Sequence, residues 1–392
     1  ISISSSSDDD IYDIGDVIVL TIQFNEIINV AGVPQLTLET GSSDGIASYS
    51  IGSGTNTLSF IYTVTVSHAS SDLEYNSNTS LALNNGVVQD LAGNNVNLTL
   101  PTVSETGSLA TNKALIIDGV FATVDSVSAI TSNGYYKVGD TLSITVHFDE
   151  NVNVTGTPQL VLETGSNDAT IYYTSGTGTS ILTFQYIAGE GHLNTDLGYV
   201  NTSSLSLNNG LIRDIAGNDA TLTLADPGVS GSLSANKALV VDAISPSVVS
   251  VSSSELNGMY NIGDTLEITV NFSEVVVANI SNGSPRITLE TGAANAVVDY
   301  SRGSGTNALI FDYIVVRDHT SEDLDYINTA SLSLNSSTIS DLSGNSAVLI
   351  LPAPSASGSL SANKSLSVKG AYAIDVSSTS TDGTYKVGDS IP

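Results

Sequence analysis

The sequence has 392 residues and a formal net charge of −30, and only 10 of its residues are lysine or arginine. An extended basic patch is excluded because there are so few cations. We therefore expect neither binding to the phosphates of a nucleic acid nor attraction to an anionic membrane. Cysteine is absent, which excludes disulfide bonds, catalytic thiols and zinc–thiolate sites, and no apolar run approaches the roughly 18 residues of a membrane span.

Alternation of apolar and polar residues begins near the N-terminus and predicts a series of short strands. Residues 17–24 and 57–62 alternate β-branched or aromatic side chains with polar ones, and helical periodicity is nowhere sustained. Asn84-Asn85-Gly86 predicts a hairpin turn, because Asn and Gly tolerate positive φ. We predict nine strands in the first repeat of a sandwich, near residues 1–5, 16–24, 34–39, 46–51, 57–64, 81–83, 86–90, 97–100 and 114–118.

The same pattern then recurs along the chain. A Gly-Asp pair returns at intervals of 124, 124 and 125 residues, at Gly15-Asp16, Gly139-Asp140, Gly263-Asp264 and Gly388-Asp389. A period of this length lets each copy bury a core of its own. The predicted fold class is all-β, with tandem Ig-like β-sandwich domains arranged end to end. The expected repeats are 1–119, 120–243 and 244–370, and residues 371–392 begin a fourth, so we expect a segment of a longer array.

Acidic residues recur at three positions of the repeat. A glutamate follows the long second strand, an aspartate opens an Asp-x-x-Gly-Asn loop, and another aspartate ends the last strand. These residues are Glu26, Glu150 and Glu274; Asp90, Asp214 and Asp341; and Asp118 and Asp242. In the third repeat Lys369 stands where the other two have the linker aspartate, and the segment 275–284 is three residues longer than its counterpart.

The odd number of predicted strands decides which of these residues should meet. If successive strands alternate in direction, the chain enters each repeat at one pole and leaves at the other. Counting along the chain places the Glu26 loop at the upstream pole, and the Asp16 turn, the Asp90 loop and Asp118 at the downstream pole. Asp90 and Asp118 should therefore face Glu150. By the same count Asp214 and Asp242 should face Glu274.

Several strings of the first repeat recur with little change in the others. They are Pro-Gln-Leu-Thr-Leu-Glu-Thr-Gly at 34–41, Gly-Ser-Gly-Thr at 52–55, Asp-Leu-Ala-Gly-Asn at 90–94 and Asn-Lys-Ala-Leu-Ile-Ile-Asp-Gly at 112–119. This set resembles the bacterial Ig-like repeats of giant surface and type I-secreted (RTX) adhesins over essentially the whole chain. The resemblance implies an extender module of a surface protein that carries calcium between its domains. Similar repeats also occur in surface-layer and filament proteins.

Converging carboxylates repel one another, so either their pKa values rise or a cation joins them. Calcium takes six to eight oxygen ligands in loose geometry, which suits carboxylates and Asn amides. The alternative is a structural loop, in which each Asp accepts hydrogen bonds from its own turn and the Glu is solvated. The candidate metal ligands are Asp90, Asp118, Glu150, Asp214, Asp242 and Glu274, with Asn94, Asn218, Asp16 and Asp140 as secondary candidates.

Two other residue types recur at fixed positions. His68, His192 and His319 are too few in each repeat for a zinc site, so local hydrogen bonds are expected. Lys113, Lys237 and Lys364 could pack their stems along the sandwich, or could form isopeptide bonds. The sequence contains no constellation of nucleophile and base, so an enzyme is not expected.

Two classes of function remain. In the first, the chain is a structural extender of a large bacterial cell-surface or secreted adhesin, stiffened by calcium at its domain junctions. In the second, it is a self-associating surface-layer or filament subunit, or a glycan-binding repeat. The near-identical motifs in all copies favour the first. The expected partners are the adjacent repeats, other copies, or a host or glycan ligand of domains outside this sequence, and the expected location is extracellular. Lys369 is expected to pair with Asp341 at the third junction, and the alternative is that Asp375, six residues further on, replaces the missing aspartate as a ligand.

Overall fold

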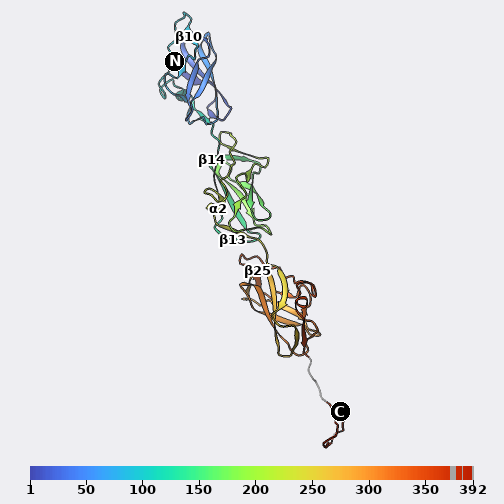
Figure 1. Cartoon of the computed structure of the whole chain (residues 1–392). Helices are drawn as coiled ribbons and strands as arrows, with labels where there is room; N and C mark the ends of the chain where they lie inside the picture. Colours follow the sequence, from blue (N-terminus) through green and yellow to red (C-terminus); the bar gives the residue numbers. More distant parts are fainter. Residues whose placement is uncertain (371–376, 382, 391–392) are drawn as a thin grey trace. The chain divides into compact units, whose positions relative to one another are not determined.

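The structure is a computed structural model of the chain, and it describes residues 1–370, 377–381 and 383–390. Contacts divide the chain into two compact units whose border runs through the second repeat. The first comprises Ile1–Asn133, Thr141–Tyr186 and Asp196–Leu239, and the second comprises Gly134–Asp140, Ile187–Thr195 and Val240–Pro392. Short strands dominate both (Figure 1).

The first repeat consists of two sheets. The larger is an 8-stranded sheet whose path runs β1 (Ser2–Ser5), β3 (Val17–Ala31), β6 (Thr55–Thr63), β5 (Gly45–Ile51), β4 (Gln35–Glu39) and β8 (Glu74–Tyr75), with β10 (Val87–Asp90) on β3 and β9 (Leu81–Ala82) on β4. The smaller is a 3-stranded sheet of β2 (Asp10–Tyr12), β11 (Leu115–Asp118) and β7 (Ala69–Ser70). The four-residue helix α1 (Leu109–Asn112) precedes β11.

Strand alternation explains why this repeat folds as a sandwich. Ile18, Leu20 and Ile22 of β3 are completely buried, while the residues between them are not. Phe60 and Tyr62 of β6 join them in one hydrophobic cluster, which also includes residues of β11. A sheet with one apolar face buries that face against a second layer.

Strand β3 is much longer than the sequence predicts. It pairs with β6 down to Gln23, shifts register, and resumes pairing at Ile28. Its last four residues pair with β10, which places Asp90 opposite Ile28. Glu26 therefore lies within an irregular stretch of a continuous strand, two residues from the partner of Asp90, and the expected loop after residue 24 is absent.

The second repeat contributes a sheet to each unit. In the first unit lie β12 (Val124–Ala129), β14 (Thr141–Thr155), β17 (Thr179–Ile187), β16 (Ala169–Ser175), β15 (Gln159–Glu163), β19 (Gly198–Tyr199), β20 (Leu205–Ser206) and β21 (Leu211–Asp214), together with the helix α2 (Leu233–Asn236). In the second unit lie β13 (Gly134–Tyr136), β22 (Leu239–Asp242) and β18 (Leu193–Asn194). Both sheets have the strand order of their counterparts in the first repeat.

The third repeat has the same two sheets and its own hydrophobic cluster. The larger contains β23 (Val248–Ser253), β25 (Thr265–Asn279), β28 (Thr306–Ile314), β27 (Ala296–Arg302), β26 (Arg286–Glu290), β30 (Asp325–Tyr326), β31 (Leu332–Ser333) and β32 (Thr338–Ser340). The smaller contains β24 (Gly258–Asn261), β33 (Leu366–Lys369) and β29 (Thr320–Ser321), and the helix α3 (Leu360–Asn363) precedes β33.

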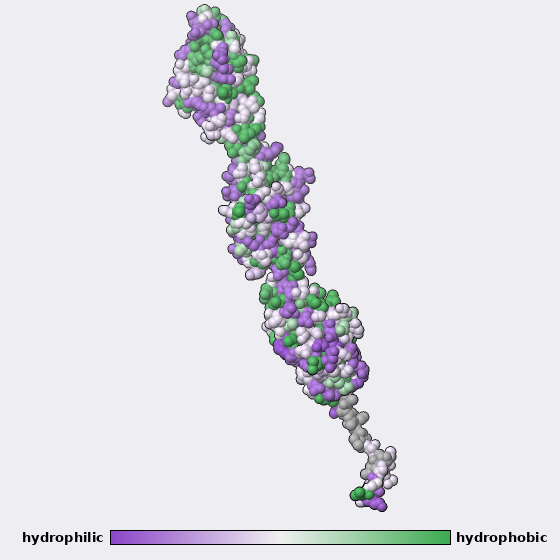
Figure 2. Space-filling view, in the orientation of Figure 1, coloured by the Kyte–Doolittle hydropathy of each residue, from purple (hydrophilic) through white to green (hydrophobic). Residues whose placement is uncertain are grey.

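The predicted fold class is confirmed: the chain is all-β, with three repeated β-sandwich domains in tandem. The strand predicted at 97–100 does not form, and the short strands β2, β7 and β8 were not predicted. The domain boundaries and the end-to-end arrangement stay predictions. In the described part of the chain no helix is long and apolar enough to span a membrane. Polar and apolar residues are interspersed on the visible surface (Figure 2).

Candidate metal centres

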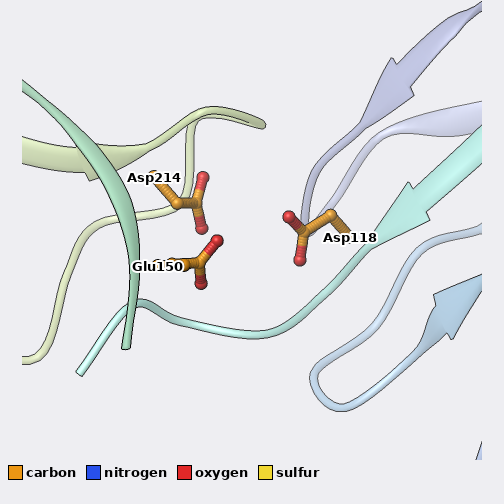
Figure 3. A group of neighbouring side chains, drawn as sticks. All are labelled: Asp118, Glu150 and Asp214. Carbon is orange, nitrogen blue, oxygen red and sulfur yellow. The ribbon is translucent and has the colours of Figure 1, made fainter. Parts of the chain in front are cut away.

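Three carboxylates from two successive repeats converge in the first unit. Asp118 ends β11, Glu150 lies within β14, and Asp214 ends β21. Each offers a carboxylate oxygen that lies within 4.8 Å of the others. Figure 3 shows the three groups turned toward one space, with Asp118 approaching from the side opposite Glu150 and Asp214. We call this group the first triad.

The loop that follows β21 holds Asp214 in place. One carboxylate oxygen accepts hydrogen bonds from the backbone N–H of Gly217 at 2.7 Å and of Asn218 at 2.9 Å, and the other accepts one from Asn218 Nδ2 at 2.9 Å. Gly217 adopts a φ of +119°, and a Cβ there would lie 2.7 Å from Asp13 Oδ2. The Asp-x-x-Gly-Asn motif is therefore a structural turn, and it also presents its carboxylate to the triad.

Proximity and burial disfavour the charged forms of Glu150 and Asp118. The pKa of Glu150 is raised from 4.5 to about 7, first by burial and then by the charges of Asp118, Asp214 and Asp149. Burial also raises the pKa of Asp118, with a further contribution from Asp214, and the backbone N–H of Val120 opposes it. A bound cation would offset this repulsion.

The second unit repeats the arrangement with Asp242, Glu274 and Asp341, which we call the second triad. Asp341 accepts hydrogen bonds from the backbone N–H of Asn345 at 2.8 Å and from its Nδ2 at 2.7 Å. Asp242 accepts one from Ser343 Oγ at 2.9 Å. Burial raises the pKa of Glu274, followed by the charges of Asp242 and Asp341.

The donor set of both triads fits calcium. Two oxygens on one calcium ion at about 2.4 Å lie at most about 4.8 Å apart, which the carboxylate separations satisfy. All donors are hard oxygens, with no His or Cys in either group, so a zinc site is disfavoured. Three carboxylates leave further positions for bidentate coordination, backbone carbonyls and water, and calcium tolerates such loose geometry better than magnesium does.

The sequence-based grouping was right for Asp118 with Glu150 and for Asp242 with Glu274, but wrong for the loop aspartates. Asp90 lies at the upstream pole, where it lines a pocket of about 450 Å³ with Glu26 and Asn94. The reason is the unbroken course of β3, which brings the end of β10 beside Glu26. Each linker aspartate therefore meets the glutamate and the loop aspartate of the following repeat.

The structure also changes the assignment of the loop aspartates of the second and third repeats. Asp214 belongs with Glu150 and not with Glu274, and Asp341, which the sequence reasoning did not select as a ligand, completes the second triad. The signal for Asp341 was present in the third copy of the Asp-x-x-Gly-Asn motif.

The secondary candidates have other contacts. Asp16 Oδ2 accepts the backbone N–H of Asp13 at 3.0 Å, and Asp140 Oδ2 accepts that of Lys137 at 3.0 Å, so both cap their own turns. Asn94 Nδ2 donates to Asp90 Oδ2 at 2.7 Å. Asn218 lies beside the first triad as a hydrogen-bond donor to Asp214.

The histidines form local hydrogen bonds, as expected. His68 Nδ1 lies 2.7 Å from the Tyr62 hydroxyl, and His319 Nδ1 lies 2.9 Å from that of Tyr313. His192 Nδ1 accepts the backbone N–H of Gly189 at 3.0 Å. These contacts stabilise the loops that follow the central strands.

Among the lysines, Lys113 Nζ lies 3.1 Å from Asp9 Oδ1, and Lys364 Nζ donates to the Glu255 carbonyl at 2.8 Å. Lys369 Nζ pairs with Glu322 Oε1 at 2.6 Å. The expected pair of Lys369 with Asp341 was wrong, because Asp341 lies in the second triad. Asp375, the alternative ligand considered for the third junction, lies outside the described residues.

No family model matches the chain, and no curated protein matches it. Among solved structures, the chain is similar to the three N-terminal domains of the highly immunogenic outer capsid protein (Hoc) of bacteriophage RB49, with 10% sequence identity and a TM-score of 0.19. The match covers 86% of this chain and 96% of that chain. A TM-score this low carries no structural argument, so the fold assignment rests on the two sheets of each repeat.

Proposed function

We propose that the chain is a non-enzymatic extender segment of an extracellular, cell-surface or secreted adhesin, and that calcium bridges its successive repeats. The observation that carries this proposal is the recurrence of one triad at two junctions. In both, the linker aspartate of one repeat meets a glutamate and a loop aspartate of the next. A cation bound there would have ligands from two successive repeats and would link them.

The electrostatics support a role for the cation. Three carboxylates that share a junction repel one another, and a divalent ion reverses that balance. Extracellular calcium is plentiful, so a weak site with a Kd of roughly 10⁻⁴–10⁻³ M would suffice outside a cell. The net charge of −30 also keeps neighbouring copies apart and disfavours nonspecific binding to anionic surfaces.

Isothermal titration of the whole chain with calcium tests the proposal. We expect two sites, of which Asp118→Asn removes one and Asp242→Asn the other, since each substitution replaces a carboxylate ligand with a neutral amide. Asp168→Asn, at an exposed loop position of the second repeat, is the matched control and should leave both sites intact. Absence of calcium binding by the unmodified chain would exclude the bridging role.

Small-angle scattering tests the extender role itself. We expect a maximum dimension far larger than that of a compact 392-residue globule, and a narrower range of shapes with calcium than with chelator. A compact profile in both conditions would contradict the proposed function.

A second candidate function is glycan binding by the third repeat. A surface pocket of about 560 Å³ there is lined by Asp299, Asp312 and His319 together with apolar residues that include Val297 and Ile314. Asp299 is paired there with Arg286, and Asp312 with Arg302. These polar groups offer hydrogen bonds to sugar hydroxyls, and the exposed Val297 and Ile314 offer apolar contact to a ring face. Binding of the chain to a glycan array, abolished by Asp299→Ala, would favour this function over a purely mechanical one.

A further inference from the structure

At the first and second junctions, one asparagine contacts the preceding repeat through both ends of its side-chain amide. Asn218 Oδ1 accepts the backbone N–H of Ile14 at 3.0 Å, and its Nδ2 donates to the Asp118 carbonyl at 2.9 Å. Asn345 does the same in the second unit: its Oδ1 accepts the N–H of Val138 at 3.0 Å, and its Nδ2 donates to the Asp242 carbonyl at 2.7 Å.

The same amide group also fixes the loop aspartate of its own repeat. Nδ2 has two hydrogens, and in each copy it donates both to the linker carbonyl and to the loop carboxylate, at 2.9 Å for Asp214 and 2.7 Å for Asp341. The side chains of Asn218 and Asn345 are buried. Because Oδ1 faces a backbone N–H, the orientation of the amide is determined by its partners.

Both groups that each asparagine contacts in the preceding repeat belong to the main chain. The side chains around them differ, since Asp13 precedes Ile14 at the first junction and Lys137 precedes Val138 at the second. The contact is nevertheless the same. The asparagine contact depends only on the backbone of the turn before it and of the linker. Repeats with different side chains at these places can therefore make the same contact.

We propose that Asn218 and Asn345 are positioning residues that dock each repeat onto the preceding one and hold the linker aspartate over the glutamate and loop aspartate of the triad. None of these hydrogen bonds requires a cation as a partner, so we expect the docking to operate with or without one. The proposal therefore stands separately from calcium binding.

The first repeat supplies a matched control. Asn94 makes the same bonds within its loop, from its N–H to Asp90 Oδ1 at 2.8 Å and from Nδ2 to Asp90 Oδ2 at 2.7 Å. In the described residues no hydrogen bond joins the Asn94 side chain to another repeat. Comparing Asn218→Ala with Asn94→Ala thus separates the loss of docking from the loss of loop structure.

Amide hydrogen exchange of the full chain, in calcium and in chelator, is the test. Removing the acceptor of the Ile14 N–H should accelerate its exchange about five- to tenfold in Asn218→Ala under both conditions, because the loss of one net hydrogen bond shifts a local opening equilibrium by that order. Asn94→Ala should leave the Ile14 amide unchanged. Calcium titration of Asn218→Ala should show weaker binding at the first triad and unaltered binding at the second.

Unchanged exchange at Ile14 in Asn218→Ala would overturn the proposal, as would equal acceleration in Asn94→Ala. If Asn218→Ala does not fold, Asn345→Ala, read out at the Val138 amide, provides an independent test. If the unmodified chain binds no calcium but Asn218→Ala still accelerates exchange at Ile14, the docking role holds and the calcium bridge fails.

Discussion

The first and second junctions have the same docking asparagine and the same triad, but they differ in how the negative charge is compensated. At the first, Asp13 lies beside Gly217, and burial raises its pKa, with further contributions from Asp16 and Asp214. At the corresponding place in the second, Lys137 Nζ donates to the Gly344 carbonyl at 3.2 Å. One position thus carries a fourth acid in one junction and a cation in the other.

A second difference points the same way. Asp242 accepts a hydrogen bond from Ser343 Oγ, whereas the residue at that loop position beside Asp118 is Ala216, which has no donor side chain. The second junction therefore has two compensating groups that the first lacks, whereas at the first the charge of Arg213 partly offsets that of its neighbours and lowers the pKa of Asp13. The matching residue of the third repeat is the uncharged Ser340. The repeat thus keeps its backbone docking constant and varies its charge compensation, so we expect the first junction to depend more strongly on a bound cation.

The largest expected effect is the response of unfolding to calcium. Calcium at about a hundredfold over its Kd should stabilise an occupied site by about 2.7 kcal/mol. We expect Asp118→Asn to lose more of this stabilisation than Asp242→Asn, as measured by thermal unfolding with calcium and with chelator. Asp168→Asn serves as the control. Equal losses at the two junctions would show that the difference in compensation has no energetic consequence.

Exchanging the residues at the variable position should invert the comparison. Asp13→Lys should stabilise the first junction in chelator by about 1 kcal/mol, because it removes one negative charge and adds a donor to the loop carbonyl. Lys137→Asp should destabilise the second by a similar amount and make it calcium-dependent. Urea unfolding in chelator measures both. If the two exchanges change stability in the same direction, the compensation argument is wrong.

The sequence predicted the sandwich and the repeats because alternation in segments such as 17–24 and recurring Gly-Asp pairs are local signals. It also predicted that Asp118 would meet Glu150. It misplaced Asp90, because counting strands assumed that each one ends where its alternation ends. The register shift between Gln23 and Ile28 and the pairing of β10 with β3 are long-range features that no local pattern reports.

A smaller effect should appear with pH in the absence of calcium. The pKa of Glu150 is about 7 in the folded chain, against 4.5 for an ordinary glutamate such as that of the unfolded chain. Glu150 therefore binds a proton more tightly in the folded state. The contribution of Glu150 protonation to the free energy of unfolding is fully present below about pH 4.5 and is lost as the pH rises through 7. Solvent reaches Glu150 and weakens the effect.

Urea unfolding at pH 5 and pH 8 in chelator should therefore show a drop in stability at the higher pH that is reduced in Glu150→Gln. Glu26→Gln changes the matching residue of the first repeat, which belongs to neither triad, and should retain the full drop. A drop of the same size in both variants would show that Glu150 does not titrate in this range.

The smallest expected effect concerns the linker of the third repeat, where Lys369 replaces the aspartate of the first two. Its ammonium pairs with Glu322, whose side chain is 87% exposed, and such surface pairs contribute about 0–1 kcal/mol. Lys369→Ala should therefore change stability by less than 1 kcal/mol and leave the number of calcium sites at two. Lys369→Asp supplies the linker carboxylate that the first two repeats have, and in a chain extended through a complete fourth repeat it should create a third site. A third calcium ion bound while Lys369 is still present would show that the linker residue does not decide whether a junction holds a metal, and the contrast between the first two junctions would then need another cause.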